Sequence, residues 1–203
     1  MTYPLSKQGV FLTIQGEGTM TGQPMIFVRL AGCSVGCVLC DTDYKVFERV
    51  ESLEIVNRIK ESASLTYSKE VWITGGEPVD HDLEELVSAM KDAGFFVSIA
   101  TSGHKSVPDR LKYWHGCRVC VSPHDPSKWV EMTGDELNIV PMLAGYSLQD
   151  FIGVLNSRPS GFRAKRVTPC EGRPETVSEC VDFVNRNYGW TLGVQAHKSW
   201  GVA

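Results

Sequence analysis

Three cysteines, Cys33, Cys37 and Cys40, lie within eight residues of the chain, in the spacing C-x3-C-x2-C. Thiolates are soft ligands that suit zinc and iron-sulfur clusters. Structural zinc commonly takes four protein ligands, often from two separated C-x2-C pairs, and no fourth ligand is evident beside this loop. A cluster takes one thiolate per iron, so three cysteines would leave one iron open to a cofactor or substrate. The spacing therefore favours a [4Fe-4S] cluster over zinc.

Other chemically rich segments follow apolar runs along the rest of the chain. They are rich in glycine, hydroxyl and charged residues, and comprise AGC (31–33), TGGEP (74–78), ATSGH (100–104), VSPHD (121–125), VTPCE (167–171) and VQAHK (194–198). Ligands bind at the carboxyl ends of parallel strands. If each apolar run is such a strand, these segments meet at one edge and form a site.

The pattern of apolar residues supports that arrangement, because strand and helix patterns alternate. Strands are expected at 24–32, 70–76, 95–103, 118–123, 136–142, 162–168 and 190–195, and helices at 52–63, 82–94, 147–156 and 174–187. Such alternation predicts a parallel sheet wrapped by helices. A full eight-fold barrel needs about 250 residues. We therefore predict an α/β fold with a partial, incomplete parallel β/α barrel of about six strands.

Helical spacing also predicts which side chains face the core. Leu53, Val56 and Ile59 fall on one face of the first helix. The second helix has a similar apolar face, formed by Leu83, Leu86, Val87 and Met90.

The length, composition, net charge and cysteine count of the chain limit the classes of protein that it can belong to. The 203 residues are 42% hydrophobic, which suits a single domain over 1–203 with one core. A net charge of −4 argues against a protein that binds nucleic acid through its phosphates. The sequence shows neither a membrane-length apolar run nor the order of a secretory signal. Seven cysteines, an odd number, fit a reducing compartment, so we expect a cytoplasmic location.

Two of these motifs together resemble the radical S-adenosylmethionine superfamily: the cysteines of 33–40 and the G-G-E-P of 75–78. The resemblance implies a radical SAM core whose Cys33, Cys37 and Cys40 hold a [4Fe-4S] cluster. In that superfamily the open iron binds S-adenosylmethionine, and one electron cleaves it to a 5′-deoxyadenosyl radical. The protein then positions and shields the cofactor.

More of the chain resembles one family, the 7-carboxy-7-deazaguanine synthases. The similar segments are TIQGEGTMTGQPMIFVRLAGC (13–33), CDTDY (40–44), VSPHD (121–125) and VQAHKSWGVA (194–203). The resemblance implies a lyase that converts 6-carboxy-5,6,7,8-tetrahydropterin into 7-carboxy-7-deazaguanine, with loss of ammonia, in deazapurine and queuosine biosynthesis. It also implies Mg²⁺, held in part by the hydroxyl of Thr42, and oxygen ligands suit that ion.

Site residues carry over from the family position by position. Those implied to contact the substrate are Ile14, Gln15, Gly16, Glu17, Arg29, Thr74, His197 and Ala203. Those implied to contact S-adenosylmethionine are Leu39, Asp41, Gly76, Glu77, Ser102, Ser122, Pro123, His124, Thr168, Pro169, Cys170 and Glu171. His124 stands where the family has lysine. From the residues alone, Arg29 is the clearest of these, because an arginine in an apolar strand needs a polar partner and can bind a carboxylate bidentately.

The resemblance further implies a homodimer and an electron donor such as flavodoxin or ferredoxin, with no direct contact to nucleic acid or membrane. Two alternatives remain open at this point. A glycyl-radical-enzyme activase would share the cysteines and G-G-E-P, and a non-enzymatic metal-binding module would share the cysteines alone. Cys117, Cys120, Cys170 and Cys180 are expected to be packing residues, since residues three apart in a strand face opposite ways.

Overall fold

A computed structural model describes residues 1–37, 40, 43–142 and 145–202 of the chain. Within these ranges, one mixed sheet takes in nine strands: β1 (Thr2–Ile14), β2 (Pro24–Leu30), β3 (Glu48–Glu51), β4 (Glu70–Gly75), β5 (Phe96–Thr101), β6 (Cys117–Val121), β7 (Thr133–Ile139), β8 (Gly161–Val167) and β9 (Trp190–Leu192). The helices are α1 (Ser52–Ala63), α2 (Glu84–Asp92), α3 (Asp109–Lys112), α4 (Leu148–Ser157), α5 (Glu175–Arg186) and α6 (Ala196–Trp200), with single 3-10 turns η1 (Gly18–Met20), η2 (Pro78–Asp80) and η3 (Pro126–Lys128).

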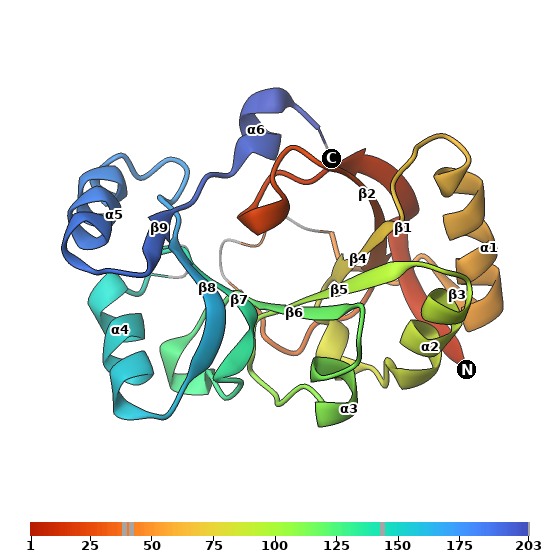
Figure 1. Cartoon of the computed structure of the whole chain (residues 1–203), viewed down its shortest axis with the longest axis horizontal. Coiled ribbons are helices and arrows are strands. Elements are labelled where there is room, and N and C mark those ends of the chain that lie inside the picture. Colours follow the sequence, from red (N-terminus) through yellow and green to blue (C-terminus); the bar gives the residue numbers. More distant parts are fainter. Residues whose placement is uncertain (38–39, 41–42, 143–144, 203) are drawn as a thin grey trace.

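The order of strands across the sheet is β3-β1-β2-β4-β5-β6-β7-β8-β9. All pairs from β2 to β9 are parallel, whereas β1 pairs antiparallel with both β2 and β3. The sheet curves without closing, with helices α1, α2, α4 and α5 along its outer side (Figure 1). This confirms the predicted partial β/α barrel, and the antiparallel β1 and β3 extend it beyond the expected strands.

Alternation along the parallel strands separates a core face from an inner face. Residues such as Val28, Ile73, Ile99 and Val119 are fully buried in the hydrophobic core. Their neighbours along each strand, including Phe27, Trp72, Ala100 and Cys120, line a cavity on the concave side. Successive residues of a strand face opposite sides of the sheet, so the pairing register of the strands sets both the core face and the cavity face.

The predicted helix faces are largely confirmed. Leu83, Leu86, Val87 and Met90 are at most 2% exposed. In α1 the expectation for Leu53 is wrong, since its side chain is 68% exposed. Leu53 lies in the first turn, and the buried face of the helix is instead formed by Ile55, Val56 and Ile59.

No helix in the described ranges is long and apolar enough to cross a membrane.

Candidate active site

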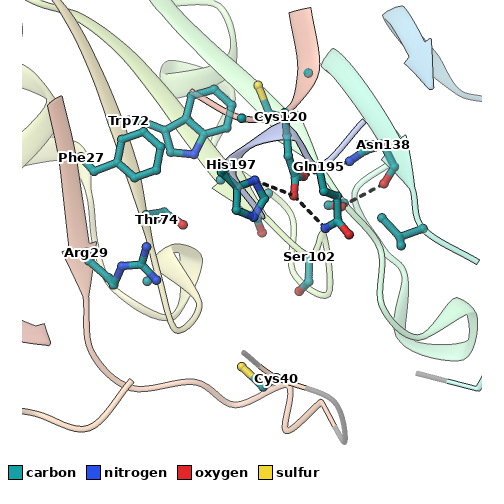
Figure 2. Close-up of a pocket in the computed structure, with 18 of the residues that line it drawn as sticks. Phe27, Arg29, Cys40, Trp72, Thr74, Ser102, Cys120, Asn138, Gln195 and His197 are labelled. Carbon is teal, nitrogen blue, oxygen red and sulfur yellow. Dashed lines mark hydrogen bonds and ion pairs between the residues drawn. The ribbon is translucent and has the colours of Figure 1, made fainter. Parts of the chain in front are cut away.

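A cavity of about 790 Å³ occupies the concave side of the sheet. Its walls come from the carboxyl-terminal parts of β2, β4, β5, β6 and β7, the loop after β1 and the segment of α6. In Figure 2, Phe27, Trp72, Thr74 and Arg29 lie on one side of it, and Asn138 and Gln195 lie on the other. The strand ends therefore do meet in a single site.

The three cysteines Cys33, Cys37 and Cys40 all line this cavity. Burial raises the pKa of Cys37 to about 11, and negative charge on Cys33 and Cys40 adds to the effect. The Cys37 sulfur also lies 2.9 Å from Nδ1 of His124. A thiol in this setting is expected to ionise when a cationic metal centre binds to it, because thiolates are the form that ligates metals.

Gly75 and Gly76 set the spacing between the cysteine loop and the G-G-E-P segment. The Gly76 amide donates to the Leu30 carbonyl, and the Glu77 amide donates to the Gly32 carbonyl, both at 3.0 Å. A Cβ on Gly75 would lie 1.9 Å from the Leu30 oxygen, and a Cβ on Gly76 would lie 1.9 Å from the Gly32 oxygen. The glycines thus let two backbones touch, which brings Cys33 beside Glu77.

Replacing Gly75 by alanine is therefore expected to lower the free energy of unfolding by about 3 kcal/mol or more. The new methyl group would meet backbone, which cannot rotate away, and Gly75 has a φ of +131° that side chains rarely adopt. Gly153→Ala in α4 is the matched control, because a Cβ there meets nothing within 4 Å. We expect that control to gain up to about 1 kcal/mol. Urea unfolding of both variants checks this, and equal stability of Gly75→Ala and the parent would contradict the packing.

The Glu77 carboxylate, only 2% exposed, joins the ends of β4 and β5. One oxygen accepts from the Val79 amide at 3.2 Å, and the other accepts from the amide and hydroxyl of Ser102 at 2.8 and 2.6 Å. His104 Nδ1 lies 3.6 Å from the same carboxylate. Glu77 and Ser102 therefore form one hydrogen-bonded unit at the cavity wall.

Asp80 ties the cysteine loop to this unit. Its carboxylate accepts from the amide and hydroxyl of Ser34, each at 2.8 Å, and it pairs with Lys105 and His104. Burial alone would raise the pKa of Asp80, but the hydrogen bonds from Lys105 and Ser34 outweigh it and lower the pKa to about 2. Ser34, the residue after Cys33, is thereby bound to Asp80 in the segment after β4, and Asp80 is in turn bound to Lys105 and His104 in the loop after β5.

An aromatic and cationic wall lies along β2 and β4. Phe27 is in register with Trp72, and Arg29 with Thr74. The Phe27 and Trp72 rings are stacked, with centroids 6.3 Å apart and an interplanar angle of 23°. The Arg29 guanidinium lies 5.5 Å from the centre of the Phe11 ring. This wall offers flat apolar surface next to a fixed positive charge.

Glu17 faces that wall from the loop after β1. Gln195 Nε2 donates to one of its oxygens at 2.9 Å, and Asn138 Nδ2 donates to the other at 3.3 Å. His197 Nδ1 lies 3.9 Å from the same carboxylate. The Ala196 amide donates to the Gly16 carbonyl at 2.9 Å, so the start of α6 closes over the loop.

Most of the site residues predicted from the sequence line this one cavity. They are Ile14, Gln15, Gly16, Glu17, Arg29, Thr74, Gly76, Glu77, Ser102, Ser122, His124, Glu171 and His197, together with the three cysteines. Pro123, Thr168, Pro169 and Cys170 are not among its lining residues. Thr168 and Cys170 are buried, with exposed fractions of 1% and 6%, and the Thr168 hydroxyl donates to Asn138 of the cavity lining. Leu39, Asp41, Thr42 and Ala203 lie outside the described residues.

The cavity also has lining residues that the sequence analysis did not select. Prominent among them are Phe27, Trp72, Cys120, Glu136, Asn138 and Gln195. Cys117 and Cys120 do face opposite ways, since Cys117 packs in the core while Cys120 lines the cavity. Phe27 could have been predicted, because it lies two residues before Arg29 in the same strand and so faces the same side of the sheet. Asn138 belongs to no motif that marks it as a site residue.

Comparison with known proteins identifies the family. No family model matches the chain. The 7-carboxy-7-deazaguanine synthase of Escherichia coli strain K12 is 38% identical, and that of Bradyrhizobium diazoefficiens is 30% identical, each over 100% of both chains. The crystal structure of QueE from Escherichia coli superposes with a TM-score of 0.74 at 26% identity, covering 97% of this chain and 95% of that one. This chain therefore belongs to the 7-carboxy-7-deazaguanine synthase family.

Proposed function

We propose that this protein is a radical S-adenosylmethionine lyase that converts 6-carboxy-5,6,7,8-tetrahydropterin into 7-carboxy-7-deazaguanine and ammonia. The observation that carries the proposal is one cavity lined by the three cysteines of the loop and by Arg29 and Glu17. Family membership supports the same reaction. The product is an intermediate suited to queuosine and other deazapurine biosynthesis.

The donor set fits a cluster better than a single ion. Three cysteines of one loop line the cavity. A [4Fe-4S] cluster takes one thiolate per iron, so these three fit it and would leave one iron for S-adenosylmethionine. Cys33, Cys37 and Cys40 would hold it. When reduced by an external electron donor, it would supply the one electron that cleaves bound S-adenosylmethionine, and the resulting 5′-deoxyadenosyl radical would remove a hydrogen atom from the substrate.

The protein's own part is to bind and orient the pterin. Arg29 would bind the substrate carboxylate with its planar fork of donors. Glu17 would accept from the amino and ring N–H groups at the opposite end, and the stacked Phe27 and Trp72 give a flat apolar surface between. A cation and a carboxylate in one cavity would favour a substrate that carries a carboxylate and N–H donors at separate ends, and would hold it in one orientation.

Cofactor contacts are proposed for six further residues that line the cavity: Gly76, Glu77, Ser102, Ser122, His124 and Glu171. Thr42 as a ligand of Mg²⁺ rests on the family pattern, as do the homodimer and a flavodoxin-like or ferredoxin-like electron donor. The sheet that runs from β1 to β9 supports one radical SAM domain over the chain.

Anaerobic turnover tests the proposal. Reconstituted protein with 6-carboxytetrahydropterin, S-adenosylmethionine, dithionite and magnesium is expected to form a product lighter than the substrate by one ammonia. Mass spectrometry measures this, and the cofactor should be regenerated rather than consumed. Cofactor cleavage with unchanged pterin would point to a different radical enzyme, such as an activase. Zinc without labile sulfide would point to a metal-binding module.

A further inference from the structure

Strand β7 sends two polar side chains toward the loop that carries Glu17. Glu136 and Asn138 are two positions apart, so both face the cavity, while Leu137 and Ile139 face the core. Their exposures are only 4% and 7%. Buried polar groups of this kind are costly unless they are hydrogen-bonded. Their partners therefore indicate what the two residues hold in place.

Glu136 anchors the backbone that follows Glu17. Its carboxylate accepts from the Thr19 amide at 2.9 Å and from the Thr19 hydroxyl at 2.8 Å, and Arg166 Nε lies 3.3 Å away. A Cβ on Gly18 would lie 2.5 Å from a Glu136 oxygen. The loop is thus pressed onto β7 at the residue next to Glu17.

Asn138 acts on the Glu17 side chain itself. The Thr168 hydroxyl donates to Asn138 Oδ1 at 2.6 Å, which leaves the Nδ2 donors directed toward the other side. There Nδ2 donates to one Glu17 oxygen, while Gln195 donates to the other. Each oxygen of the carboxylate thus accepts from one neutral amide, which fixes the carboxylate plane without cancelling its charge, and His197 Nδ1 lies 3.9 Å away beside them.

We infer that Asn138 is a positioning residue, which holds Glu17 in the orientation that accepts from the substrate, with Glu136 fixing the loop beneath it. This inference rests on the proposed function. It also explains the choice of an amide on β7. A lysine or arginine there would pair with Glu17 and compete with the substrate, and an aspartate would repel it.

Substitutions at Asn138 test the inference through substrate binding. Asn138→Ala is expected to raise both the KM and the calorimetric Kd for 6-carboxytetrahydropterin about tenfold, the effect of one hydrogen bond to a charged group. Asn138→Asp is expected to raise them further. Cofactor cleavage by the reduced enzyme without substrate should stay within about twofold in both variants. Asn156→Ala, at an exposed position of α4, is the matched control and should change neither quantity.

A double-mutant cycle separates positioning from mere stability. In a Glu17→Gln background, Asn138→Ala should add little to the KM, because its effect passes through Glu17. Full additivity, or an unchanged Kd in the single variants, would overturn the inference. Should Asn138 variants prove unstable, Glu136→Gln provides the second route, with the same expected rise in KM. If the unmodified enzyme itself fails to bind or convert the pterin, the proposed function is what fails.

Discussion

Replacing Cys37 by alanine is expected to remove the cluster and with it all cleavage of S-adenosylmethionine. Cys37 is the middle member of the three cysteines, and it is half-buried at the cavity wall. Two thiolates leave the cluster short of a protein ligand, so assembly should fail rather than weaken. Iron and sulfide analysis of anaerobically reconstituted protein, together with the electron paramagnetic resonance of the reduced sample, measures the loss directly.

Cys117→Ala is the control for that experiment. Cys117 packs in the core, and burial raises its pKa to about 11, so it is a protonated packing residue. The variant should lose some stability, by roughly 1–2 kcal/mol, and keep the full iron and sulfide content. Survival of cluster and cofactor cleavage in Cys37→Ala would contradict the assignment of the loop. Loss of the cluster in Cys117→Ala would show a ligand set different from the one proposed.

Much of the fold followed from the sequence because β2, β4 and β5 carry runs of apolar residues and end next to glycine or polar residues. The run from Pro24 to Leu30 is an example, and its bounds match the expected strand closely. The long β1 was not expected, because Pro4 and Gly9 interrupt its pattern. In the structure, Gly9 takes a φ of +56° where the register between β1 and β2 shifts. A bulge of that kind hides a strand from periodicity.

Site residues could be predicted where a short motif indicates the chemistry, as for the three cysteines and G-G-E-P. Residues that act on a partner from a distant strand could not be predicted in this way. Asn138 meets Glu17 from a position 121 residues further along the chain, and only the order of strands brings the two together. Gly75 shows a third case: the G-G-E-P motif marks the position, but only the structure shows that the neighbouring Leu30 backbone leaves no room for a side chain there.

Substitution of Arg29 is expected to have the second large effect, and to act on substrate recognition rather than on the cluster. Arg29 is held by strand register beside Thr74 and over the Phe11 ring, so its guanidinium is already oriented. Removing one partner of a charge-assisted pair in a partly desolvated site costs about 2–5 kcal/mol. Arg29→Ala should therefore raise the KM for 6-carboxytetrahydropterin by about a hundredfold.

Arg29→Lys separates charge from geometry. Lysine keeps the positive charge but has no planar fork and no stacking on Phe11, so we expect an intermediate KM, about tenfold above the parent. Arg110→Ala is the control, because that arginine is exposed and pairs only with Glu84 among the ion pairs of the described residues. Cofactor cleavage without substrate should be unchanged in all three variants.

A pterin that lacks the carboxylate gives the sharpest readout for Arg29. The parent enzyme should bind 6-carboxytetrahydropterin far more tightly than the analogue, because the guanidinium would lose its partner. In Arg29→Ala the two affinities should converge, since neither compound can then make the pair. If the preference for the carboxylate persists in the variant, another cation binds it. Lys198 would be the first to examine, because it lines the same cavity.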